Sequence, residues 1–255
     1  MRVATWNVNS LKVRLPHLLD WLSRDPVDVV CLQETKLEDK NFPAAEIQAA
    51  GYSVVFAGQK TYNGVAIVSR EPARDVVTGI AGFEDAQVRV IAATVGNLRI
   101  VDAYVPNGQS VDSDKYRYKL GWLAAFKRWL GDELVRHPQL AVVGDFNIAP
   151  SDDDVHDPKA WEGQVLVSDP ERAAFRDLLA LGFSDAFRMF EQAEKSFTWW
   201  DYRMNAFKRG LGLRIDHVLL SAELAQRCMG VEIVRALREM ERPSDHAPVV
   251  AELRD

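Results

Sequence analysis

The segment Pro243-Ser244-Asp245-His246-Ala247-Pro248 places a carboxylate beside an imidazole in a turn bounded by prolines. A carboxylate can hold a hard cation, and a histidine titrates near neutral pH or binds a phosphate oxygen. The apolar residues 247–253 that follow are expected to form a strand that anchors this turn. Because an Asp-His pair is common in proteins, the segment alone decides little.

Four other segments place Asn, Asp or Glu directly after an apolar run that resembles a strand. They are Trp6-Asn7-Val8-Asn9, Gln33-Glu34-Thr35, Gly144-Asp145-Phe146-Asn147 and Arg214-Ile215-Asp216-His217. When polar groups recur at strand ends, the strands can bring them together at one edge of a sheet. The sequence therefore predicts one site assembled from these segments.

A hard-cation site is the first chemistry that these segments indicate. Glu34 follows the apolar run 27–32, and Asn7 and Asp245 occupy similar positions. Mg²⁺ is usually held by one or two carboxylates and keeps several water ligands, so a sparse set of oxygen donors is its expected signature. The alternative for Glu34 taken alone is an ion pair with Lys36 at the end of the strand.

Acid–base catalysis is the second chemistry that these segments indicate. Asp145 and Asn147 are two residues apart and would project from one side of a strand, where the acid can activate water and the amide can stabilise developing charge. Gly144 before them allows a close approach of the backbone. The alternative is a simple Asx turn that closes the strand.

Asp216 and His246 form a candidate dyad, because an Asp that accepts from one ring nitrogen fixes the imidazole tautomer. His217 is a weaker candidate, since neighbouring residues of a strand point to opposite faces. The remaining histidines, His17, His137 and His156, are expected to have surface roles.

Aromatic and basic residues could bind a polyanion. Tyr104 ends an apolar strand, where it is either a core residue or directs its hydroxyl at a phosphate. Trp199 and Trp200 cannot both face inward from one strand, so one is expected to be exposed or to line a pocket. Such an aromatic wall suits an unstacked base or an abasic sugar. Phosphate contacts could come from Lys60, Arg89, Lys115, Arg117, Lys119, Lys208 and Arg209.

Many short strands and few helices must position these residues. Strands are predicted at 2–7, 27–33, 53–57, 65–69, 74–78, 88–95, 98–104, 140–143, 213–220, 231–234 and 247–253, with Gly96-Asn97 as a hairpin turn. Helices are predicted to begin near Pro16, after Ser113 and near Pro170. This pattern favours an α+β sandwich over a doubly wound sheet.

The composition of the chain limits its domain number, its mode of nucleic-acid binding and its compartment. The chain has 255 residues, 47% of them apolar, and no linker or low-complexity segment, so we expect one domain spanning residues 1–255. A net charge of −6 argues against a protein that coats nucleic acid non-specifically. The chain has two cysteines, of which Cys31 lies in an apolar run and is expected to be buried, and it has no apolar run of secretory or membrane-spanning type. These features predict a cytoplasmic protein without membrane contact.

Together with Tyr62-Asn63-Gly64-Val65-Ala66 and Phe197-Thr198-Trp199-Trp200-Asp201-Tyr202-Arg203, these segments resemble the exonuclease III family of DNA-repair nucleases, within the endonuclease/exonuclease/phosphatase superfamily. The resemblance implies a four-layered α/β sandwich, with two packed β-sheets flanked by helices. It also implies Mg²⁺- or Mn²⁺-dependent cleavage of double-stranded DNA by a monomer. Such enzymes cut 5′ to abasic sites or remove nucleotides and blocking groups from 3′ ends.

The resemblance also implies roles for individual residues. Glu34 would be the main metal ligand, in a set that includes Asn7, Asp145, Asn147, Asp245 and His246. Asp145 would activate water, Asn147 would stabilise the transition state, Tyr104 would meet the scissile phosphate or leaving oxygen, and Asp216 would orient His246. DNA contacts would come from Asn9, Lys60, Arg89, Asn107, Lys115 and Trp199. The segments 105–110 and 161–168, the latter containing Leu166, vary in the family.

Two other functions are alternatives to a DNA-repair nuclease. A phosphatase of the same superfamily that acts on inositol lipids or sphingomyelin would share the metal and Asp-His features, but residues 199–203 and 212–217 favour the DNA branch. A catalytically silent DNA-damage-binding protein is the rival from another class. The acid, amide and histidine positions are all present, which argues against it.

Overall fold

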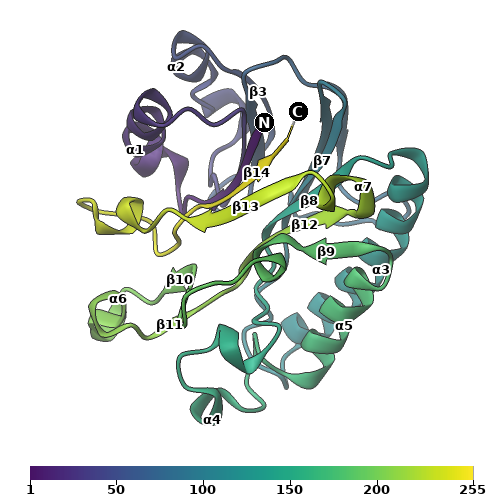
Figure 1. The fold of residues 1–255 in the computed structure, drawn as a ribbon, viewed down its shortest axis with the longest axis vertical. Coiled ribbons are helices and arrows are strands. Elements are labelled where there is room, and N and C mark those ends of the chain that lie inside the picture. Colours follow the sequence, from purple (N-terminus) through teal and green to yellow (C-terminus); the bar gives the residue numbers. More distant parts are fainter. Residues whose placement is uncertain (255) are drawn as a thin grey trace.

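The computed structural model describes residues 1–254 and contains two mixed sheets of six strands that pack face to face (Figure 1). The first sheet comprises, in order, β13 (Cys228–Ile233), β14 (Val249–Leu253), β1 (Arg2–Asn7), β2 (Val29–Gln33), β4 (Val65–Ser69) and β3 (Ser53–Ala57). The second comprises β5 (Arg74–Thr78), β6 (Val90–Val95), β7 (Leu98–Tyr104), β8 (Leu140–Asp145), β12 (Asp216–Ser221) and β9 (Phe183–Asp185).

The central strands are buried on both faces, which explains their nearly continuous apolar sequences. In β1, Val3 packs between the two sheets while its neighbour Ala4 packs against helices outside them. In β7, Ile100 packs between the two sheets and Val101 packs against the helices outside them. The strand period of two thus supplies one shared core between the sheets and one core on each outer face.

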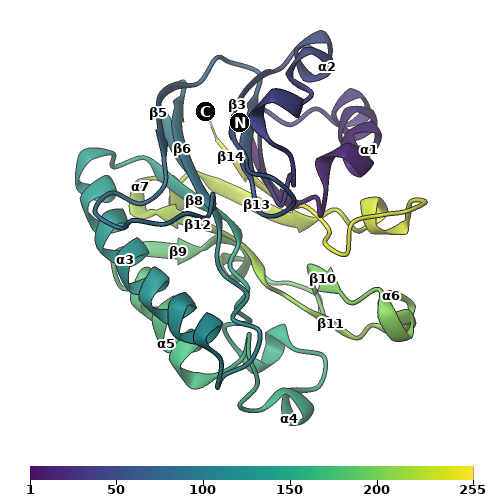
Figure 2. The ribbon, with the colours of Figure 1, turned by 180° about the vertical axis from the view of Figure 1, so that it is seen from behind.

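Helices cover both outer faces and complete the four layers (Figure 2). The first sheet is covered by α1 (Leu11–Arg24) and α2 (Ala44–Ala49), and the second by α3 (Asp114–Arg136) and α5 (Asp169–Leu179). The prediction of a four-layered α+β sandwich is confirmed. None of the helices in residues 1–254 combines the length and apolar character that a membrane span requires.

Parallel pairing aligns the ends of the strands that carry the predicted site. Strands β1 and β2 are parallel, with Asn7 opposite Gln33, and β7 and β8 are parallel, with Tyr104 opposite Asp145. Gly144 makes the second pairing feasible, because a Cβ at this position would lie 1.9 Å from the carbonyl oxygen of Ala103. The role predicted for Gly144 in a close backbone approach is confirmed.

Most predicted elements are present, and five strands, 2–7, 53–57, 65–69, 74–78 and 98–104, have the bounds predicted. The prediction that the first helix begins near Pro16 is wrong, because α1 begins at Leu11 and passes through this proline. Pro16 and Lys12 are both exposed, so the Lys12 carbonyl, which loses its helical donor at Pro16, can be hydrated.

The single strand predicted at 213–220 is divided in two. Residues Gly212–Leu213 form β11, which pairs with β10 (Trp199–Trp200), and β12 begins only at Asp216. Between them the backbone amides bond outside the ladder: Arg214 donates to the Asp154 carbonyl, and Ile215 donates to the Thr198 hydroxyl. The β10–β11 hairpin, with α6 (Ala206–Arg209) between its strands, projects from the sandwich (Figure 1).

The remaining elements are short. They are α4 (Pro158–Trp161), α7 (Ala222–Ala225) and the 3-10 turns Asp39–Asn41, Asp152–Asp154, Ala186–Met189, Arg203–Asn205 and Arg235–Glu239. The sequence patterns predicted none of these elements, nor α2, α6, β9 and β10. Each is six residues or fewer, too short for hydrophobic periodicity to define.

Candidate active site

The predicted polar residues meet at one end of the sandwich. The side-chain amide nitrogen of Asn7 donates to Glu34 Oε1 at 2.8 Å and to Asp145 Oδ2 at 2.9 Å. Asn7 and Asp145 belong to different sheets, so this amide connects the two sheets at their common edge. In this arrangement its nitrogen, rather than its oxygen, faces the carboxylates.

Glu34 lies just beyond β2 in a left-handed backbone conformation, with φ of 52°. This conformation is uncommon for a residue with a side chain and tends to occur at functional sites. The Lys36 ammonium lies 2.9 Å from Glu34 Oε2, so the ion pair considered as an alternative also forms. Lys36 also donates to Asn9 Oδ1, which links this pair to the rest of the site.

Asp245 completes the oxygen-rich side of the site. Its Oδ1 accepts from the Asn9 amide at 2.9 Å and its Oδ2 from the Trp199 indole at 3.0 Å. Burial opposes ionisation of this carboxyl group, but the neighbouring charge of His246 and these donors lower the pKa of Asp245. Asp245 is therefore a carboxylate that could face a cation.

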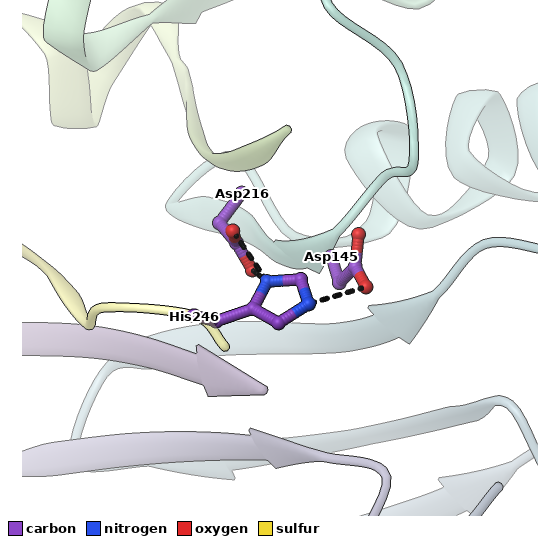
Figure 3. A group of neighbouring side chains, drawn as sticks. All are labelled: Asp145, Asp216 and His246. Atoms are coloured by element: carbon purple, nitrogen blue, oxygen red, sulfur yellow. Dashed lines mark hydrogen bonds and ion pairs between the residues drawn. The ribbon is translucent and has the colours of Figure 1, made fainter. Parts of the chain in front are cut away.

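Asp145, Asp216 and His246 form a buried cluster (Figure 3). The Nδ1 atom of His246 lies 2.9 Å from Asp216 Oδ2, and its Nε2 lies 3.8 Å from Asp145 Oδ2. Burial opposes protonation of His246, but the charges of Asp216 and then Asp145 raise its pKa to about 10. For Asp145, burial is the main cause of a pKa raised to about 7, partly offset by His246.

Asn147 follows β8 in a left-handed conformation with φ of 50°. Its backbone amide donates to Asp145 Oδ1 at 2.9 Å, so the Asx turn considered as an alternative is present. Its side-chain nitrogen donates to the Val105 carbonyl at 3.0 Å, and its Oδ1 accepts from Asn107 at 3.0 Å. Hydrogen bonds therefore fix the side chain and the backbone of Asn147 together.

Tyr104 lies half-buried at the end of β7, beside the carboxylates of the site. Burial, and then the charges of Glu34 and Asp145, raise the pKa of its hydroxyl well above the ordinary value. Arg89 stacks over its ring at 4.7 Å and donates to its carbonyl at 3.1 Å. Arg89 also donates to Gln87 and is mostly buried, so its contact with DNA stays a prediction.

The two adjacent tryptophans separate as the sequence predicts. Trp200 is fully buried and packs edge-on against Phe207, whereas Trp199 is only partly buried and bonds to Asp245. Trp199 also packs against a cluster of apolar side chains that includes Leu166, Leu213 and Ile215. Trp199, rather than Trp200, therefore borders the site.

Among the basic candidates, Lys60 and Lys115 are exposed, as are Lys208, Arg209 and Arg117, the last of which pairs with Asp114. The proposal of Lys119 as a phosphate contact is wrong, because its side chain is 0% exposed and pairs with Glu171. Lysine is almost never fully buried without a partner, and this partner lies 52 residues away in the sequence. No local pattern could have identified it.

A buried ionic network beside the site was also missed. The Arg214 guanidinium bonds to Asp154 at 2.7 Å and to Asp185 at 2.8 Å. It also donates to Nδ1 of His217, whose Nε2 then donates to the Ile148 carbonyl. His217 therefore faces away from the cluster, as predicted, while His17, His137 and His156 are half-buried rather than fully on the surface.

The donor set fits a hard divalent cation. Four carboxylates, Glu34, Asp145, Asp216 and Asp245, lie in this region against two basic side chains, Lys36 and His246. One potential ligand atom from each of Asp145, Asp216 and His246 lies within 4.8 Å of the others. An excess of carboxylate oxygen favours hard divalent cations over softer metals.

Comparison with known proteins identifies the family of the chain. The model of the endonuclease/exonuclease/phosphatase family matches residues 4–246. The chain belongs to this family. Among its relatives, exodeoxyribonuclease III of Haemophilus influenzae is 36% identical over 100% of both chains. DNA repair nuclease APEX1 of Danio rerio is 32% identical over 98% of this chain and 81% of the relative.

Solved structures of the family superpose closely on the chain. The 3′ phosphatase NExo from Neisseria bound to a product DNA hairpin is 47% identical, with a TM-score of 0.98 over 99% of each chain. An AP endonuclease from Archaeoglobus fulgidus is 38% identical, with a TM-score of 0.95 over 99% of each chain. The fold is therefore shared along the full length.

Proposed function

We propose that this chain is a Mg²⁺-dependent DNA-repair phosphodiesterase that acts on double-stranded DNA at 3′ ends and 5′ to abasic sites. The chain is a hydrolase of the nuclease type, as its full-length relatives indicate. The observation that carries the proposal is the buried Asp145–His246–Asp216 cluster beside Glu34 and Asp245. A relative that binds a DNA hairpin as product supports DNA as the substrate.

The metal-binding residues in this proposal are Glu34 and Asp245, with the oxygens of Asp145 and Asn147 nearby. Asn7 holds Glu34 and Asp145 in place through its amide nitrogen, and the protonated His246 acts as a hydrogen-bond donor rather than a ligand. When bound, a divalent cation supplies positive charge that stabilises a phosphoryl oxygen. Mg²⁺ and Mn²⁺ both fit the oxygen donors, and activity with each is part of the proposal.

The protein groups supply the proton transfers and the orientation. Asp145, with a pKa of about 7, is suited to accept a proton from an attacking water. The imidazolium of His246, held by Asp216, can donate to a phosphate oxygen. Asn147 and the Tyr104 hydroxyl would hold the phosphoryl group and the leaving oxygen in place.

Substrate selection is assigned to the side of the site that contains Trp199. This ring borders apolar side chains, which suit a deoxyribose without a base better than a stacked nucleotide. The exposed Lys60 and Lys115, with Asn9 and Asn107, would contact the strands around it. We further propose that the protein acts as a monomer and a single domain.

Cleavage assays with three duplexes test this function. The substrates are a duplex with one abasic site, a duplex with a recessed undamaged 3′ end, and one with a 3′ phosphate. Turnover in Mg²⁺ and its loss in EDTA are expected on at least one of them. If none is cleaved while an inositol phosphate or sphingomyelin is hydrolysed, the phosphatase alternative replaces this proposal.

A further inference from the structure

A fully buried ion pair joins helices α3 and α5 behind the site. Lys119 of α3 and Glu171 of α5 both have 0% exposed side chains, and the ammonium bonds directly to the Glu171 carboxylate. Removing two charges from water is costly, and apolar residues often pack as stably as a buried ion pair does. A contribution to stability therefore does not by itself explain this pair.

The ammonium of Lys119 has two other acceptors. It donates to the Asn147 carbonyl at 2.7 Å and to the Asn107 carbonyl at 3.1 Å. With Glu171 as the third acceptor, all three donor hydrogens of the ammonium are used. The backbones of two candidate site residues thus bond to one buried charge.

Glu171 extends the connection to a third loop. Its Oε1 accepts from the Leu166 amide at 3.0 Å, and its Oε2 accepts from the Ser168 amide at 3.2 Å. The Leu166 side chain belongs to the apolar cluster against which Trp199 packs. The pair therefore connects the loops that contain Asn107, Asn147 and Leu166.

Two of these loop residues have a strained backbone. Asn147 has φ of 50° and Leu166 has φ of 78°. Left-handed conformations are unfavourable at most residues with side chains, less so at Asn than at Leu, and they persist only when surrounding contacts hold them. The bonds from Lys119 to the Asn147 carbonyl and from Leu166 to Glu171 supply such contacts.

We propose that Lys119, held by Glu171, is a positioning residue that fixes the backbone of Asn147 and the loop of Asn107 in the orientation that the reaction needs. The inference rests on the proposed function, because it assigns Asn147 to the reacting phosphate. Lys119 itself touches neither substrate nor metal, since its side chain is enclosed by the protein. Its removal should lower kcat by much more than it raises KM for DNA, to which only the Asn107 loop would contribute.

The test uses Lys119→Met and the double variant Lys119→Met/Glu171→Gln. The double variant leaves no unpaired buried charge. Its single Gln oxygen can still accept from the Leu166 amide, and its side-chain nitrogen can donate to the Ser168 hydroxyl. The matched control is Arg99→Met/Glu133→Gln. This second buried pair, 3% and 2% exposed with Nε and Oε2 3.0 Å apart, also involves α3 and makes no contact with the site residues.

Single-turnover cleavage is measured for each variant below its unfolding temperature. The double variant at Lys119 should lose on the order of 10²-fold in kcat, the scale of a misplaced catalytic group, while the control stays within about twofold. In an Asn147→Ala background, Lys119→Met should add little further loss. Equal losses in both double variants, additive losses with Asn147→Ala, or a Lys119 double variant that does not fold would each overturn the proposal.

A second measurement does not depend on activity. The Asn147 amide donates to Asp145 Oδ1, so its hydrogen exchange reports how firmly this turn is held. Exchange at Asn147 should accelerate in the Lys119 double variant and not in the control. Should the unmodified protein fail to cleave any DNA, the proposed function is lost, and unchanged exchange at Asn147 would separately refute the positioning role.

Discussion

The Nδ1 atom of His246 lies 2.9 Å from one carboxylate oxygen of Asp216 and 3.1 Å from the other. This contact orients the ring, so that Nε2 faces Asp145 (Figure 3). Asp216 therefore acts on the reaction chiefly through the orientation and charge of His246.

The first prediction tests this dependence. His246→Ala should lower the chemical step by about 10²–10⁴-fold, and Asp216→Asn should lower it less, because the ring remains. The double variant should be little worse than His246→Ala alone, since residues that act as a unit are not additive. Single-turnover rates measure each loss, and additive losses would show that the two residues act separately.

Glu34 provides the second prediction. Glu34→Gln keeps the shape of the side chain and removes the charge, so cleavage in Mg²⁺ should fall by at least about 10²-fold while the fold is retained. The measurement is activity against Mg²⁺ concentration, together with a thermal melt. Lys36→Met is the control for the ion pair, because it removes the partner and leaves the carboxylate. Near-native turnover in Glu34→Gln would exclude Glu34 as a ligand.

The sequence could predict the parts of this site that follow from strand ends. Apolar runs located β1, β2 and β8, so Asn7, Glu34 and Asp145 could be placed at their ends before the structure was known. Lys119 could not be assigned, because a lysine on a helix is normally solvated and Glu171 is remote in sequence. The interruption between β11 and β12 could not be predicted from the sequence either. The Thr198 hydroxyl that accepts from the amides of Ile215 and Asp216 comes from another segment of the chain.

The third prediction concerns stability against pH. Burial, and then the adjacent Arg214 charge, lower the pKa of His217 from 6.5 to about 4. Between pH 6.5 and about pH 4, His217 is protonated in the unfolded chain but remains neutral in the folded protein. The contribution of this residue to the unfolding free energy therefore falls as the pH is lowered through this range. The full loss is about 2.5 pKa units, or about 3 kcal/mol.

Urea denaturation of the protein and of His217→Gln at pH 7, 5.5 and 4.5 isolates this contribution. Gln can still accept from Arg214 and donate to the Ile148 carbonyl, so the two proteins differ mainly in the titrating group. Their difference in unfolding free energy should shrink as the pH falls. Asp145, whose pKa is raised to about 7, has the opposite slope in both proteins and cancels. A difference independent of pH would contradict the assignment.

Lys115 provides the fourth prediction. It lies in the first turn of α3 and is exposed, whereas Lys119, one turn further along the same helix, is buried. Lys115→Ala should weaken binding to damaged and intact duplexes alike and reduce the magnitude of the salt slope by about 1. Salt titrations of binding measure both effects. Lys127→Ala is the control, since that lysine is paired with Asp177. An unchanged salt slope would remove Lys115 from the DNA contacts.

The last prediction separates the two tryptophans. Trp199 borders the site and bonds to Asp245, so Trp199→Ala should reduce the ratio of cleavage on abasic over intact duplexes more than it weakens binding. Trp199→Phe keeps the ring without the donor and should preserve that ratio if apolar contact selects the abasic sugar. Trp200→Ala instead removes a buried ring and should cost about 3–5 kcal/mol of unfolding free energy, with the ratio intact in the folded protein. If Trp199→Ala leaves the ratio unchanged, the selection belongs to the wall formed by residues 161–168, and Trp199 serves only to hold Asp245.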